Sequence, residues 1–152
     1  MIEAVTALVF AGTAMVLLCD ARGIITLSGC LLLLVSWILG FIVKFCISYI
    51  VGLCCFFTSN GFGIIYMRQV ITDVFSGALL PLSFYPQWFQ KAAGVLPFQA
   101  VVYTPTQIFL NRIQGAEVAH ALLLQAFWAI ALWIFGHFFF QFAVKKITIQ
   151  GG

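Results

Sequence analysis

SGCLLLLVSWILGFIVKFCISYIVGLCCFF, residues 28–57, decides the fold, because this long apolar stretch contains a single charged residue, Lys44. At about 1.5 Å per residue, one helix over the stretch would be roughly 45 Å long, against a hydrocarbon core of about 30 Å. The residues around Lys44 include no Pro, Asn or Asp that would make a turn. We therefore predict one long helix, tilted or projecting beyond the bilayer, rather than two short spans.

The rest of the chain is similarly apolar. Of its 152 residues, 64% are hydrophobic and 7% are charged, whereas a soluble domain is about 45–50% apolar and about 25% charged. The mean hydropathy is +1.15. This composition excludes a water-soluble domain, because too few charged groups remain to cover its surface, and it excludes intrinsic disorder. We predict an all-α fold, a polytopic bundle of membrane helices.

Charge-poor runs predict four transmembrane spans in one transmembrane domain over residues 1–152, at 4–19, 28–57, 69–84 and 118–144. Between the last two spans, segment 85–117 holds three of the four prolines and yet remains largely apolar. Broken helices at membrane depth are tolerated only where they are buried in protein or line a cavity. Segment 85–117 is therefore expected to form short re-entrant or interfacial helices that lead into the last span.

Small and polar residues recur every four positions in three of the predicted spans. Such positions lie on one slanting face of a helix, and small residues there allow transmembrane helices to approach closely. We interpret the rows as helix-packing faces. They are Ser36, Gly40, Lys44, Ser48 and Gly52; Gln69, Asp73, Gly77 and Pro81; and Ala121, Gln125, Ala129, Trp133, His137 and Gln141.

Lys44 and Asp73 are charged residues inside predicted spans. A lysine near the bilayer centre costs about 2.5–3.5 kcal/mol on insertion scales. Two interpretations of Lys44 stay open. In the functional one, it lines a polar path for a substrate. In the structural one, its side chain extends to the membrane surface or bonds a backbone carbonyl. Counted from the intervening loop, Lys44 lies roughly 20 Å and Asp73 roughly 8 Å into its helix, so we expect no ion pair between them. We expect Asp73 to pair with Arg68, a neighbouring subunit or water.

Motifs for catalysis and for cofactor binding are absent from the sequence. No G-x-x-x-x-G-K-[ST] occurs, so the chain is not expected to bind ATP through a P-loop. His120 and His137 do not form H-E-x-x-H, and we interpret His137 as an interhelical hydrogen-bond donor rather than a metal ligand. We predict no catalytic residue, no cofactor and no metal site. The charges form no basic cluster, which argues against nucleic-acid binding.

Several short motifs in the second half of the chain resemble ABC-transporter type-2 permeases. They occur in the family's order: FSGALLPL at 75–82, FYPQW at 84–88, LPF at 96–98, YTP at 103–105, IQG at 113–115 and KKITIQGG at 145–152. The resemblance is strongest over residues 70–152 and covers the last four of the family's six spans. Met1 is then either an internal methionine of a longer reading frame or the start of a naturally truncated protein.

The resemblance implies the permease subunit of an ABC exporter, or its C-terminal part, in the plasma or inner membrane. It implies three partners: a cytoplasmic ABC ATPase subunit, a second permease subunit in a homo- or heterodimer, and the lipid bilayer. It places loop 58–68 and the C-terminus in the cytoplasm. The alternative is a truncated, non-transporting membrane protein that docks onto another permease; a membrane-embedded enzyme is less favoured. Candidate residues of the translocation path or of helix packing are Lys44, Asp73, Gly77, Pro81, Pro86, Trp88, Pro97 and His137.

Overall fold

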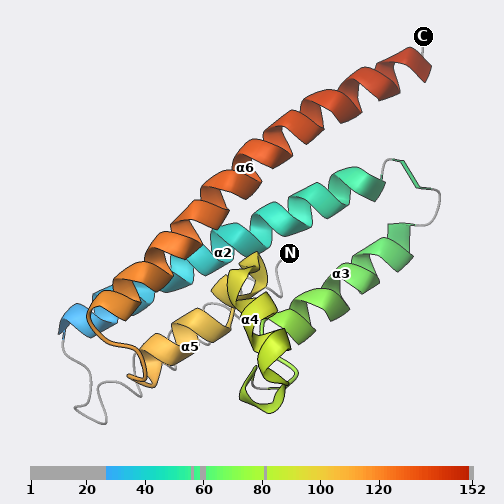
Figure 1. Cartoon of the computed structure of the whole chain (residues 1–152). Helices are drawn as coiled ribbons and strands as arrows, with labels where there is room; N and C mark the ends of the chain where they lie inside the picture. Colours follow the sequence, from blue (N-terminus) through green and yellow to red (C-terminus); the bar gives the residue numbers. More distant parts are fainter. Residues whose placement is uncertain (1–26, 56, 59–60, 81, 151–152) are drawn as a thin grey trace.

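The computed structural model describes residues 27–55, 57–58, 61–80 and 82–150 (Figure 1). Every regular element in these ranges is helical, which confirms the predicted all-α class for the described part of the chain. The predicted span at 4–19 lies outside the described residues. The elements in chain order are α2 (Leu27–Cys55), α3 (Gly61–Phe75), the 3-10 helix η1 (Leu82–Phe84), α4 (Gln87–Val95), the 3-10 helix η2 (Pro97–Ala100), α5 (Tyr103–Phe109) and α6 (Ala116–Gln150).

The two long helices α2 and α6 lie side by side and run in the same direction, while α3 runs back beside α2 (Figure 1). Leu33 packs with Val118 near the start of both helices, and Val43 packs with Ala129 further along. The predicted single helix over residues 28–57 is present as α2. Both long helices are long and apolar enough to cross a membrane, over Gly29–Cys55 and Ala116–Lys145.

The buried positions of α2 do not follow the predicted row of every fourth residue. They are separated mostly by three or four residues, which is the spacing of a helix seam that stays on one face. An i+4 row drifts by about 40° per step, because a helix has 3.6 residues per turn. Ser36 and Gly40 are accordingly buried, Lys44 and Ser48 are half-buried, and Gly52 is exposed. The buried positions of α2 are Leu33, Ser36, Gly40, Val43, Cys46 and Leu53.

The helix after α2 differs from the predicted span at 69–84. Helix α3 covers Gly61–Phe75, so it begins eight residues earlier and its 15 residues span only about 22 Å. It ends because Gly77 adopts φ +78, a left-handed conformation that an α-helix cannot continue through. The amides of Ala78 and Leu79 then donate to the carbonyl oxygen of Asp73, at 3.1 and 3.2 Å. Three of the four predicted spans fall on described residues, and two membrane-length helices are present there.

The segment 85–117 forms short helices, and its prolines begin them. Pro86 is the N-cap of α4, Pro97 is the first residue of η2, and Pro105 lies in the first turn of α5. A proline costs little at these positions, because the first amides of a helix have no intrahelical acceptor. Aromatic side chains hold α4 to the end of α3, with the Phe75 and Phe89 ring centroids 4.9 Å apart.

Candidate functional site

Gln125 of α6 joins the last helix to both α2 and the broken segment. Its side chain is 2% exposed. Nε2 donates to the carbonyl oxygen of Ala100 in η2 at 2.8 Å and to that of Ser36 in α2 at 3.3 Å. Two buried oxygens beside these bonds, Gln125 Oε1 and Ser36 Oγ, have no hydrogen-bond partner among the described residues. A polar side chain in the middle of an apolar helix therefore acts as a three-way connection.

Gly40 allows the same connection to form. A Cβ atom placed on Gly40 would lie 2.5 Å from the carbonyl oxygen of Ala100, closer than real Cβ atoms approach a backbone oxygen. The chain at η2 can therefore lie directly on α2 only because position 40 has no side chain. We call Ser36, Gly40, Ala100 and Gln125 the Ala100 junction. Close by, Trp128 Nε1 of α6 donates to the carbonyl oxygen of Val95 at 3.0 Å.

Four polar side chains connect α2 with α3, and we call them the polar chain: Ser48, Arg68, Gln69 and Asp73. Arg68 Nη1 donates to Ser48 Oγ at 3.1 Å, and Arg68 Nη2 lies 3.4 Å from Gln69 Oε1. Gln69 Nε2 donates in turn to both carboxylate oxygens of Asp73, at 2.9 and 3.0 Å. Gln69 is therefore the direct partner of Asp73, and it connects that carboxylate with Arg68, one of the partners the sequence suggested.

Lys44 lies one turn before Ser48 on α2 and is half-buried. Ser48 Oγ donates to the carbonyl oxygen of Lys44 at 2.9 Å, so the backbone of Lys44 adjoins the polar chain. Within the ranges that the structure describes, the Lys44 ammonium makes no hydrogen bond or ion pair. Lys44 thus adjoins the polar chain through its backbone only.

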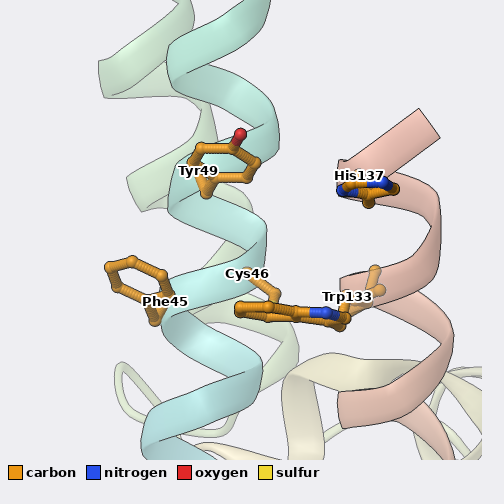
Figure 2. A pocket seen from close by; sticks show the side chains of 6 residues that line it. Phe45, Cys46, Tyr49, Trp133 and His137 are labelled. Atoms are coloured by element: carbon orange, nitrogen blue, oxygen red, sulfur yellow. The ribbon is translucent and has the colours of Figure 1, made fainter. Parts of the chain in front are cut away.

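A largely apolar cavity of about 270 Å³ lies between α2 and α6. Figure 2 shows Phe45, Cys46 and Tyr49 on α2 at one side of it, and Trp133 and His137 on α6 at the other. The His137 ring nitrogen lies 3.0 Å from Gln141 Nε2, one turn along the same helix. His137 therefore bonds within α6, and this differs from the interhelical bond that we expected.

A second cavity, of about 460 Å³, lies where α5 turns into α6. We call it the corner pocket. Its lining is polar and includes four titratable side chains, Tyr103, Arg112, Glu117 and His120. Two of the eleven charged residues of this apolar chain thus meet in one pocket. Both residues belong to the predicted segment 85–117, but nothing in the sequence shows that α5 and α6 bring them into one pocket.

The eight residues predicted from the sequence do not form one site. Pro97 is buried beside the Ala100 junction, whereas Pro86 and Trp88 are exposed on α4. Gly77 ends α3, Asp73 belongs to the polar chain between α2 and α3, and Lys44 adjoins that chain through its backbone carbonyl. His137 lines the apolar cavity. Pro81 lies outside the described residues.

The family model for "ABC-2 family transporter protein" matches residues 1–151. The chain belongs to this family. The resemblance inferred from the motifs at 75–152 is thereby confirmed. ABC-2 permeases are the membrane component of their transporters and not the catalytic one. No curated protein and no solved structure matches the chain.

Proposed function

We propose that this ABC-2 protein is the permease subunit, or the C-terminal part of one, of an ATP-driven exporter that works with a separate cytoplasmic ATPase subunit. The family match over residues 1–151 carries the proposal. The two parallel apolar helices and the helical segment packed against them support it, because such a bundle offers membrane-crossing elements and a structured region at one end.

The Ala100 junction suggests how the parts would move. Helices α2 and α6 and the broken segment are bonded together through Ser36, Ala100 and Gln125, so they would move as one body. Helix α3 is attached to that body by aromatic contacts at one end and by the bond from Arg68 to Ser48. Rocking driven by the ATPase would then displace α3 relative to α2, and segment 85–117 would serve as a re-entrant gate on the outer side.

The polar chain between α2 and α3, together with Lys44, is the proposed translocation-path surface. Lys44 has no partner among the described residues, and Asp73 is bonded only through a neutral amide in that part of the chain. Ionisable side chains inside membrane helices commonly mark substrate or ion paths. Helix α3 also exposes Phe62, Tyr66 and Met67, a surface that lipid or a second permease subunit would cover.

Copurification tests the proposed function. The tagged full-length gene product is extracted from its native membrane in mild detergent, and an unrelated multispan protein with the same tag serves as the control. We expect an ABC ATPase subunit to copurify with the permease and not with the control protein. The complex is expected to hydrolyse ATP at a rate that differs from that of the isolated ATPase. A full-length product that never associates with an ATPase would overturn the proposal.

The nucleotide sequence upstream of Met1 gives an independent test. An in-frame continuation that encodes two more apolar spans supports a complete permease. An immediate stop codon favours the alternative, a truncated protein that docks onto another permease without transporting a substrate. That alternative would be supported if the protein copurifies with a longer permease, and not if it copurifies only with an ATPase.

A further inference from the structure

The corner pocket concentrates polar groups that the proposed transport function does not use. Its rim carries Arg112, Glu117 and His120, and the half-buried side chains of Gln99, Tyr103 and Gln107 also line it. Only 7% of the chain is charged. Convergent polar groups in a cavity of about 460 Å³ are typical of a small-molecule site.

Arg112 and Glu117 line the pocket with opposite charges that are both free. Among the residues that the structure describes, neither side chain forms an ion pair or a hydrogen bond. Their positions are fixed by the loop between α5 and α6, in which Asn111 and Gly115 adopt φ of 54 and 56. The Arg112 amide donates to the carbonyl oxygen of Gln107 at 3.1 Å, which ties this loop to α5.

Two free opposite charges in one pocket favour a ligand that carries both charges. An anion alone would meet the Glu117 carboxylate, and a cation alone would meet the Arg112 guanidinium. A phosphate bonds well to a guanidinium, and an ammonium group bonds to a carboxylate. The amides of Gln99 and Gln107 and the hydroxyl of Tyr103 can donate hydrogen bonds to phosphate or ester oxygens.

The position of the pocket relative to α6 indicates where such a ligand comes from. The apolar run that is long enough to cross a membrane begins at Ala116, next to Glu117. The end of such a run lies at the level of the lipid headgroups. We propose that the corner pocket binds a zwitterionic phosphate–amine group, supplied by the headgroup of a phospholipid such as phosphatidylethanolamine. This site does not depend on the ATPase partnership.

The full-length protein in detergent is titrated with phosphatidylethanolamine or with phosphatidylglycerol of the same acyl chains, and bound lipid is measured by native mass spectrometry. Phosphatidylglycerol keeps the phosphate and lacks the amine. We expect the wild-type protein to bind phosphatidylethanolamine more tightly. Equal affinity for the two lipids, or no binding of either, would overturn the proposal, and this comparison requires no variant.

Charge-removing variants assign the two ends of the headgroup. We expect Glu117→Gln to weaken phosphatidylethanolamine binding about two- to fivefold, the size of one exposed charge pair, and to leave phosphatidylglycerol binding unchanged. Arg112→Gln is expected to weaken the binding of both lipids. Lys91→Gln is the matched control, because Lys91 is exposed on α4 and does not line the pocket. Wild-type lipid preference in a folded Glu117→Gln protein would contradict the assignment.

Soluble phosphoethanolamine separates the two sources of this chemistry. If it displaces bound phosphatidylethanolamine, the phosphate–amine group alone is recognised, and a soluble ligand can supply it. If phosphatidylethanolamine binds and the soluble compound does not displace it, the intact membrane lipid is the ligand. Either result supports the charge pairing, provided that Glu117→Gln abolishes the preference for the amine.

Discussion

Nε2 of Gln125 lies 2.8 Å from the carbonyl oxygen of Ala100, and this hydrogen bond joins the last long helix to the segment of broken helices. The same nitrogen reaches the carbonyl oxygen of Ser36 at 3.3 Å. One buried amide therefore sets the spacing of three elements that are far apart in the sequence. Because Ala100 ends a 3-10 helix, its carbonyl oxygen has no helical amide to accept from and depends on such a donor.

Replacing Gln125 by Leu is expected to lower the free energy of unfolding by about 1 kcal/mol, because hydrogen bonds between membrane helices contribute about 0.6 kcal/mol on average and at most about 1.7. The loss stays small since Oε1 of Gln125 is itself unpaired among the described residues. Reversible unfolding in micelles measures it. Gln141→Leu is the control, because Gln141 is exposed and bonds within α6. Equal effects of the two substitutions would contradict a junction at Gln125.

Gly40→Ala is expected to destabilise the protein by about 1–3 kcal/mol, the usual cost of overpacking. The added methyl group would lie 2.5 Å from the Ala100 carbonyl oxygen, so α2 and η2 must separate. Gly52→Ala in the same helix is the matched control, since a Cβ there meets nothing within 4 Å. We expect Gly52→Ala to be neutral or slightly stabilising, because Ala favours the helix over Gly. Thermal unfolding of both variants in one detergent provides the comparison.

The sequence predicts the long helices well but not the contacts between them. An unbroken apolar run that lacks turn residues, as around Lys44, is sufficient to predict α2. The row through Ser36 and Gly40 correctly includes two buried residues, yet it includes the exposed Gly52, because an i+4 row drifts around the helix. Gln125 stood in such a row, but its acceptor Ala100 lies in another element, and neither periodicity nor composition identifies such a partner.

The end of α3 was the least predictable boundary. Charge-poor composition favoured a helix up to residue 84, whereas the helix stops at Phe75. The signal was present as Gly77 and Pro81, two residues that break helices, but we interpreted both as members of a packing row. The start of α3 was missed for the opposite reason. Gly61 and Gly63 favour a loop by propensity, and helix formation outweighs that preference in the folded chain.

Gly77→Ala is expected to cost about 1–2 kcal/mol, because Gly77 has φ +78 and an L-residue is strained in the left-handed region. The Cβ would also lie 3.3 Å from Leu82 Cγ. We expect faster hydrogen exchange at the amides of Ala78 and Leu79, which bond to the Asp73 carbonyl oxygen in this turn. The control is Gly63→Ala, a helical position with nothing within 4 Å. Unchanged exchange in the Gly77 variant would show that the turn tolerates a side chain.

Lys44→Met separates the two interpretations of the half-buried lysine. If Lys44 lines the proposed path, removing its charge lowers transport-coupled ATP hydrolysis of the permease–ATPase complex. The same change is expected to maintain or raise stability, because a charged side chain inside a membrane helix is costly. Lys91→Met, at an exposed position of α4, serves as the control. Full ATPase coupling in the Lys44 variant would show that the lysine only reaches toward the membrane surface.

Within the described residues, the bond between Arg68 and Ser48 is the only hydrogen bond that joins a side chain of α2 to a side chain of α3, so a double-mutant cycle should detect it. We expect Ser48→Ala and Arg68→Gln to be non-additive by about 0.5–1 kcal/mol, because the serine hydroxyl accepts from a charged donor at 3.1 Å while the pair is half-buried. Arg68→Gln combined with Thr106→Ala, whose hydroxyl bonds only within its own helix, should be additive within about 0.3–0.5 kcal/mol. If both pairs prove additive, the bond from Arg68 to Ser48 does not help to hold the two helices together, and α3 is freer to move against α2 than the polar chain suggests.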